Sequence, residues 1–266
     1  MTSKVSQAHS KNIHFTDKGS GSCIVFLHGF LESLEIWDDY SDKLSEKFRV
    51  VCIDLPGHGK SGNIGNEHSI ELMADCVRVV LDELKIKKCV LIGHSMGGYV
   101  ALAFAENNPE YLSGFCLFHS HSFPDSDERK KDRKMAIRVI KHNPALLINE
   151  MIPNLFAPEN FKKFGKQAEK IRQAALAMTQ KGTINSIWGM VKRKDRSHIL
   201  KNSPCPVLYI LGEQDPVMDF EVMKPLLKLS DKIQPLVIEN CGHMGFIEAK
   251  EKCLNEIDGF SKKCFK

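Results

Sequence analysis

Short runs of apolar residues alternate along the chain with longer segments whose apolar positions recur at helical spacing. Continuous apolar runs of this length are typical of parallel strands that helices cover on both faces. Strands are therefore predicted at residues 23–28, 49–54, 89–94, 113–119, 206–212 and 234–239, with a further one at 11–17. Helices are predicted at residues 34–47, 69–85, 96–107, 219–229 and 246–260. This alternation predicts a mostly parallel sheet with right-handed crossovers.

Residues 122–203 interrupt the alternation. They show no strand pattern, and several prolines separate helical segments within them. Residues 121–200 carry 17 Lys and Arg against 8 Asp and Glu, although the whole chain is nearly balanced at 37 against 33. We expect a basic helical cap at 122–203, inserted into an α/β core of residues 1–121 and 204–266.

The composition excludes several classes of protein. With 42% hydrophobic and 26% charged residues among 266, the chain is neither disordered nor collagen-like nor a coiled coil. A net charge of +4 is too small to indicate nucleic-acid binding. No run reaches the roughly 18 apolar residues of a membrane span, and no signal peptide is visible. Nine scattered Cys without a Cys-x-x-Cys pair are typical of a reducing compartment. A cytoplasmic monomer or homodimer is therefore expected.

The strongest chemical signal is the sequence Gly-His-Ser-Met-Gly-Gly at residues 93–98. It follows an apolar run and precedes a helical pattern, which is the strand–turn–helix context of a G-x-S-x-G nucleophile elbow. The turn is expected to strain the backbone of Ser95, while Gly93 and Gly97 leave room for neighbouring chain. An incidental serine in a glycine-rich turn is the alternative, and the context favours a nucleophile.

Four further segments make the chain resemble the α/β-hydrolase superfamily over nearly its whole length. In the expected order they are His28-Gly29-Phe30, the D-x-x-G-x-G-x-S loop at 54–61, Gly212-Glu213-Gln214-Asp215, and Gly242-His243. Among its members, the small single-cap esterases, C–C hydrolases and cofactor-free haloperoxidases are most similar. The resemblance implies an α/β-hydrolase fold with an inserted helical cap, and it implies no cofactor.

A serine nucleophile needs a base and an orienting acid. The family order of Ser, Asp and His implies Ser95 as nucleophile, Asp215 as acid and His243 as base. Asp215 and His243 each follow a predicted strand, where this fold places such residues. Asp125 is an alternative acid, because some members carry the acid after the sixth strand.

Two main-chain donors must also face the developing oxyanion. Met96, the residue after the nucleophile, supplies one N–H, and the resemblance implies that Phe30 supplies the other. The side chains expected to line the substrate pocket are His119, His121, Trp188, Met190 and Met244. For the two His residues a metal site is the alternative, but no third ligand stands at a matching spacing, so no metal is expected. For Trp188 and Met190 the alternative is the core of the cap.

The expected function is that of a serine hydrolase acting through an acyl-enzyme on a small-molecule ester with a small or medium acyl group. C–C bond hydrolysis, thioester hydrolysis, peptide-terminal cleavage and perhydrolysis use the same triad and remain alternatives. A ligand receptor on a hydrolase scaffold is the alternative from another class. The charged run at 126–134 predicts a solvated helix face, and the alternative is a basic surface that steers an anionic substrate.

Overall fold

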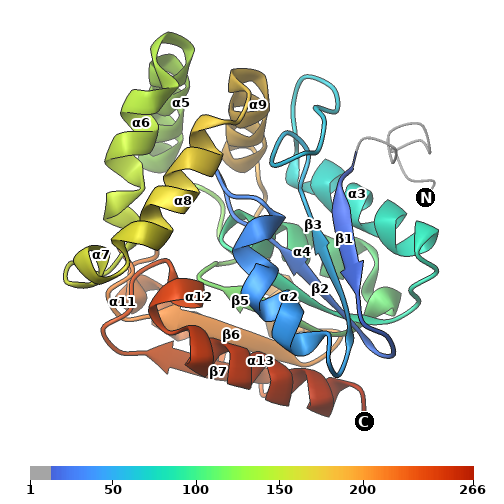
Figure 1. Cartoon of the computed structure of the whole chain (residues 1–266). Helices are drawn as coiled ribbons and strands as arrows, with labels where there is room; N and C mark the ends of the chain where they lie inside the picture. Colours follow the sequence, from blue (N-terminus) through green and yellow to red (C-terminus); the bar gives the residue numbers. More distant parts are fainter. Residues whose placement is uncertain (1–12) are drawn as a thin grey trace.

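The computed structural model describes residues 13–266 and is built around one seven-stranded sheet (Figure 1). The strand order is β1-β3-β2-β4-β5-β6-β7, in which β1 is antiparallel to β3 and all other pairs are parallel. The strands are β1 (Phe15–Lys18), β2 (Cys23–Leu27), β3 (Arg49–Ile53), β4 (Cys89–His94), β5 (Leu112–Phe118), β6 (Val207–Gly212) and β7 (Ile233–Ile238). The predicted fold class is confirmed. Of the strand expected at 11–17, residues 11 and 12 lie outside the described residues.

Helices cover both faces of the sheet, which is why the strands are apolar throughout. On one face lie α3 (Ile70–Glu83) and α4 (Met96–Asn107), and on the other lie α2 (Asp38–Leu44) and α13 (Lys250–Cys264) (Figure 1). In β2, Cys23, Val25 and Leu27 belong to the core cluster that includes α3 and α4, whereas Ile24 and Phe26 belong to the cluster that includes α2 and α13. Successive side chains of a strand point to opposite faces, so both faces need apolar residues. The core also contains the short helices α11 (Phe220–Met223) and α12 (Gly245–Glu248).

Three of the predicted helices are broken or shortened. The segment at 34–47 begins as a 3-10 helix, η1 (Leu34–Trp37), before α2, and α11 continues as a second one, η4 (Lys224–Lys228). Pro225 lacks an N–H donor, so the α-helical bonding of α11 cannot continue through it. Ala249, at φ −133° and ψ 39°, separates α12 from α13.

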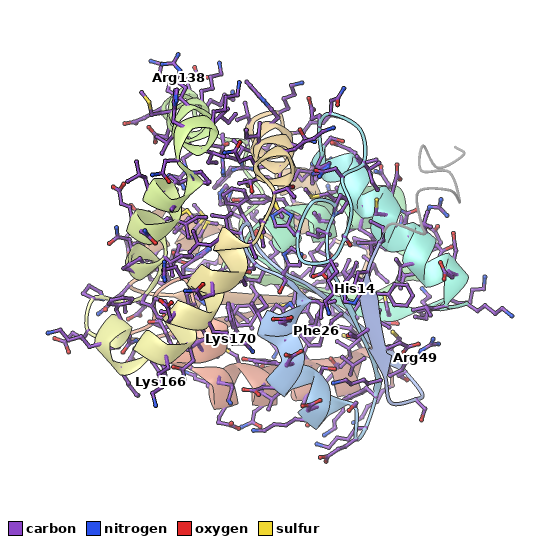
Figure 2. All side chains as sticks on the ribbon, turned by 45° about the horizontal axis from the view of Figure 1, so that its top comes forward. His14, Phe26, Arg49, Arg138, Lys166 and Lys170 are labelled. Atoms are coloured by element: carbon purple, nitrogen blue, oxygen red, sulfur yellow. The ribbon has the colours of Figure 1, made fainter. Side chains whose placement is uncertain are left out.

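Residues 122–203, all of which the structure describes, form helices and turns and contain no strand. We call α5–α10 with their connections the helical insertion. Exposed charged residues such as Arg138 and Lys166 point outward from it (Figure 2). Its helices are α5 (Asp127–His142), α6 (Pro144–Met151), α7 (Asn160–Lys163), α8 (Gly165–Leu176), α9 (Gln180–Val191) and α10 (Ser197–Lys201). Two further 3-10 helices are η2 (Pro109–Tyr111) and η3 (Pro153–Leu155). Among residues 13–266, no helix has both the length and the apolar character needed to cross a membrane.

Candidate active site

Ser95 lies in the sharp turn between β4 and α4 with a strained backbone, at φ 50° and ψ −112°. This conformation is rare for a residue with a side chain. The turn is tight enough to require glycine on both sides. A Cβ on Gly93 would lie 2.3 Å from the carbonyl oxygen of Gly97, and one on Gly97 would lie 2.7 Å from that of Leu27. The structure therefore contains the strained turn that the sequence predicts.

Asp215 and His243 meet beyond the carboxyl ends of β6 and β7. Nδ1 of His243 lies 2.9 Å from Oδ2 of Asp215. The other carboxylate oxygen accepts the backbone N–H groups of Val217 and Met218 at 2.8 and 2.9 Å. Burial alone would raise the pKa of Asp215, but the electrostatic effect of the N–H groups of His243 and His119 and their hydrogen bonds outweigh it and hold the pKa well below its usual range. The carboxylate is thus ionised and fixed in orientation.

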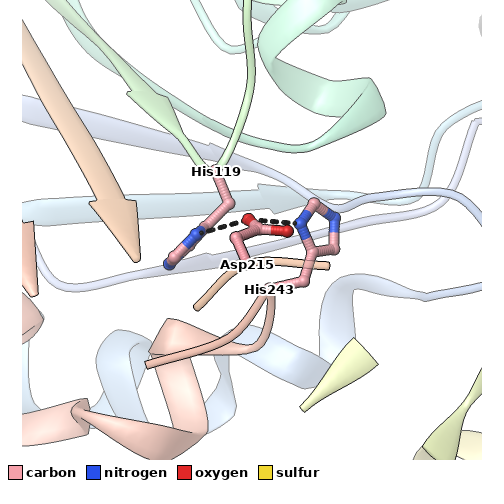
Figure 3. Close-up of side chains that lie close together, drawn as sticks. All are labelled: His119, Asp215 and His243. Atoms are coloured by element: carbon pink, nitrogen blue, oxygen red, sulfur yellow. Dashed lines mark hydrogen bonds and ion pairs between the residues drawn. The ribbon is translucent and has the colours of Figure 1, made fainter. Parts of the chain in front are cut away.

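A second histidine contacts the same carboxylate. Nδ1 of His119 lies 3.0 Å from Oδ2 of Asp215, so the rings of His119 and His243 flank one oxygen (Figure 3). The His119 side chain is fully buried and its backbone is left-handed, at φ 48°. Its Nε2 has no hydrogen-bond partner among residues 13–266. Burial lowers the pKa of His119 despite the opposing effect of Asp215, so the ring is neutral.

These three side chains are also the group, among residues 13–266, whose potential metal-ligand atoms lie within 4.8 Å of one another. Both imidazole Nδ1 atoms are within hydrogen-bond distance of the same carboxylate oxygen. Protons on the two rings are sufficient to hold the group together. The arrangement is therefore explained as a hydrogen-bonded triplet.

Behind the site, a buried ion pair connects two loops. Nδ1 of His94 lies 2.9 Å from Oε2 of Glu32, which also accepts the N–H of Gly29, and Nε2 of His94 lies 3.0 Å from the carbonyl oxygen of His243. Both neighbours of the ring are acceptors, so both ring nitrogens carry protons. Burial alone would lower the pKa of His94, but Glu32 outweighs it and the pKa is raised. The sequence contains no signal for Glu32.

A cavity of about 410 Å³ lies between the helical insertion and the carboxyl edge of the sheet. Ser95 and His243 border it together with Phe30 and Met190, so four of the residues expected at the site line one cavity. Further walls come from α5, α6, α9 and the loop at 216–218. Most of this lining is apolar, which suits an acyl chain.

The other expected pocket residues lie elsewhere. His119 contacts Asp215, and the ring of His121 lies 5.4 Å from that of Tyr99. Trp188 packs half-buried against the core, and Met244 is fully buried. None of these four borders the cavity as far as residues 13–266 define it.

Asp125, the alternative acid, lies between two arginines. Nε of Arg133 and Nη1 of Arg193 each lie 2.5 Å from one of its oxygens. Burial would raise the pKa of Asp125, but the two guanidinium groups outweigh it and lower the pKa. The charged run at 126–134 is mostly exposed as predicted, except that the Arg133 side chain is only 14% exposed. The burial of Arg133 could not be predicted from the sequence, because Arg133 stands in a run of charged residues that are otherwise mostly exposed.

A family model described as the alpha/beta hydrolase fold matches residues 23–250. The structure is similar to that of a thermophilic esterase from Thermogutta terrifontis with malate bound. The TM-score is 0.91 and the identity 32%, over 96% of this chain and 94% of that one.

Curated relatives match over most of this chain. The dihydrolipoyllysine-residue acetyltransferase component of the acetoin cleaving system of Pseudomonas putida is 27% identical over 91% of this chain. This chain spans only 64% of that protein's length. The pimeloyl-[acyl-carrier protein] methyl ester esterase of Vibrio parahaemolyticus is 25% identical over 95% of this chain and 99% of its own length.

Proposed function

Because the chain belongs to the alpha/beta hydrolase fold family, we propose that it is a serine hydrolase that cleaves carboxylic esters of small or medium acyl groups. One observation carries the proposal: Ser95 and His243 border the same cavity while Asp215 lies 2.9 Å from Nδ1 of His243. The N–H at Nδ1 of His243 donates a hydrogen bond to Asp215. The lone pair of Nε2 is therefore free to accept a proton, as a general base must. The similarity to two esterases supports the same reaction.

In the proposed mechanism, Oγ of Ser95 attacks the ester carbonyl carbon and transfers its proton to Nε2 of His243. Asp215 stabilises the imidazolium that forms. Met96 is the first residue of α4, so its N–H has no acceptor within the helix and is available to the oxyanion. Phe30, which borders the cavity, supplies the second N–H. Each such donor contributes about 2.7–4 kcal/mol to transition-state stabilisation.

The tetrahedral intermediate then collapses. The C–O bond to the alcohol breaks, and His243 returns its proton to the leaving oxygen. Water enters, gives its proton to His243 and attacks the acyl-enzyme, which releases the carboxylic acid and restores Ser95. We propose that the helical insertion acts as a cap, because its helices supply much of the apolar wall of the cavity.

The test is hydrolysis of p-nitrophenyl esters from acetate to decanoate by the wild type, Ser95→Ala and a control variant, Ser20→Ala. Ser20 lies in an exposed turn. Turnover that survives in Ser20→Ala and vanishes in Ser95→Ala is the expected result, and the best chain length measures the pocket. Equal rates for wild type and Ser95→Ala would contradict the proposal.

Two other outcomes separate the alternatives. If the folded wild type hydrolyses thioesters or C–C bonds but no ester, Ser95 remains the proposed nucleophile and the proposed substrate class is replaced. A single acylation, detected by mass spectrometry and followed by no release, would indicate a receptor.

A further inference from the structure

We propose that Arg133 binds a carboxylate of the substrate, so that the preferred esters have an acyl chain ending in a negative charge. The inference rests on the proposed function and names its substrate class. It is carried by a buried cluster of one acid and two bases, Asp125, Arg133 and Arg193, beside the catalytic cavity.

The cluster has one more positive than negative charge. Asp125 is 1% exposed in its side chain and is shared by both guanidinium groups. A buried charge is costly unless it is paired. One negative charge neutralises one arginine, so the other has no charge partner among residues 13–266.

Arg193 is saturated by its own surroundings. Its Nε donates to the carbonyl oxygen of Phe123 at 3.1 Å, and its Nη1 donates to Asp125 and to the carbonyl oxygen of Met190. Its guanidinium carbon lies 4.1 Å from the ring centre of Tyr99. Arg193 is therefore a structural cation that holds Asp125 in place, and it has little capacity for a ligand.

Arg133 is different. Its Nε bonds to Asp125, and its Nη1 and Nη2 have no hydrogen-bond partner among residues 13–266. The residue borders the cavity, as do Arg129 and Ala136 on the same face of α5. Nη1 and Nη2 of the guanidinium thus form a fork of free N–H donors beside the substrate. Such a fork matches the two oxygens of a carboxylate.

The cluster is connected to the helix that follows Ser95. Tyr99 follows Ser95 by four residues in α4, which is one helical turn or about 6 Å. Arg193 lies on the Tyr99 ring, and Arg133 joins it through Asp125. Ser95 and Arg133 border the same cavity, so one ligand can present an ester carbonyl to Ser95 and a carboxylate to Arg133. Half esters of succinate, glutarate and adipate vary the separation of these two groups by one methylene at a time.

The other charged residues that border the cavity leave Arg133 as its inner cation. Glu32 is paired with His94. Arg129, Asp132 and Glu150 are exposed and lie in water, where their interactions are screened. The buried cluster has a single uncompensated positive charge, so a single carboxylate is the chemistry that we assign.

The experiment compares ethyl hydrogen glutarate with ethyl glutaramate, its neutral isostere, by the ethanol that each releases. The readout is the ratio of the two kcat/KM values. In Arg133→Met this ratio is expected to fall about 10- to 100-fold, the range for losing hydrogen bonds to a charged group. Arg133→Lys keeps the positive charge but loses the fork of N–H donors, so it is expected to give an intermediate ratio. This variant also tests the inference if Arg133→Met folds poorly.

The matched control is Arg138→Met, an exposed arginine on the same helix. It removes the same charge from the surface and is expected to leave the ratio unchanged. An equal fall in Arg138→Met and Arg133→Met would show general steering by the basic helix and overturn the inference, as would no fall in either.

Binding is measured in parallel, by calorimetry of ethyl hydrogen glutarate with Ser95→Ala and with Ser95→Ala/Arg133→Met. If the wild type hydrolyses no ester yet the anionic ester binds only when Arg133 is present, the proposed function fails and the inference stands. If both esters are hydrolysed but bind alike with and without Arg133, the function stands and the inference fails.

Discussion

Glu32 and His94 lie 2.9 Å apart in the core, and this ion pair joins the N–H of Gly29 to the carbonyl oxygen of His243. One end of the connection therefore holds the loop that carries Phe30, and the other holds the loop that carries the proposed base. Replacing one partner leaves the other as a buried charge without compensation, which costs about 3–5 kcal/mol. The pair thus couples the stability of the fold to the geometry of the site.

We predict that Glu32→Gln lowers the free energy of unfolding most strongly in weakly acidic solution. The pKa of His94 is raised above 6.5, so its contribution is complete below that pH and is lost as the pH rises through the raised value. The pKa of Glu32 is lowered below 4.5, so its contribution is complete above that pH and is lost as the pH falls. Urea unfolding at pH 5.5 and pH 9 measures the difference.

The control for this prediction is Glu35→Gln, which removes an exposed carboxylate from the same segment. It is expected to change stability little at either pH. A loss in Glu32→Gln that is the same at pH 5.5 and pH 9 would show that the pair is not ionised.

His119→Leu is predicted to slow ester hydrolysis about 10-fold, the value of one hydrogen bond to a charged group. Without the N–H of His119, Asp215 keeps fewer of the hydrogen bonds that fix its orientation, so it positions the ring of His243 less precisely. We therefore expect kcat to fall while KM changes less, as measured by steady-state kinetics with one p-nitrophenyl ester. Stability is expected to change little, because the variant also removes the unpaired buried Nε2.

His119→Gln, which keeps a donor, should restore part of the rate, and the exposed His142→Leu serves as the control. A rise in KM with an unchanged kcat would mean that His119 acts only through packing beside the cavity.

The strands and the serine turn could be predicted because their causes are local. Buried parallel strands are continuous apolar runs, so the runs at 89–94 and 206–212 mark β4 and β6 to within a residue. The turn at Ser95 requires glycine at fixed positions, and the sequence shows it directly.

The polar pairings could not be predicted, because they join distant segments. Glu32 meets His94 across 62 positions, and His119 meets Asp215 across 96. No spacing rule covers such contacts, which depend on how β2, β4, β5 and β6 are ordered in the sheet. Once that order is known, the residue after β5 is expected near the end of β6, since Phe118 pairs with Ile210.

Glu248 is predicted to position the base. Its carboxylate accepts the N–H groups of Gly242 and Met244 at 3.1 Å, on either side of His243, and also that of Ala157 in the helical insertion at 3.0 Å. Glu248→Gln has a single amide oxygen to accept these bonds, so the loop loses its fixed position. We expect kcat to fall about 10-fold while KM changes less, because a misplaced base affects the chemical step.

Steady-state kinetics with one p-nitrophenyl ester checks this prediction, and Glu251→Gln, an exposed acid in α13, is the control. A rise in KM alone would mean that Glu248 acts on the cavity through Ala157 rather than on the base.

His68 is predicted to make the fold sensitive to acid. The residue is fully buried, and its ring Nε2 accepts the N–H of Ile64 at 3.2 Å. Its backbone N–H donates to the carbonyl oxygen of Asn185 in α9. Burial, with Lys181 adding to it, lowers the pKa of His68 from 6.5 to about 4. Between these values the unfolded chain binds more protons than the folded one, so stability falls as the pH falls.

The loss amounts to about 1.4 kcal/mol per pH unit, or about 2 kcal/mol between pH 7 and pH 5. In His68→Gln the amide oxygen can accept the same N–H but does not titrate, so the variant should lose less free energy of unfolding on acidification than the wild type. At pH 7 the variant should be the less stable of the two proteins. Urea unfolding of both proteins at the two pH values gives the comparison. His198, an exposed histidine in α10, supplies the control His198→Gln, which should follow the wild type. Parallel curves for His68→Gln and wild type would show that another group causes the acid loss, since only a proton on His68 makes the two differ.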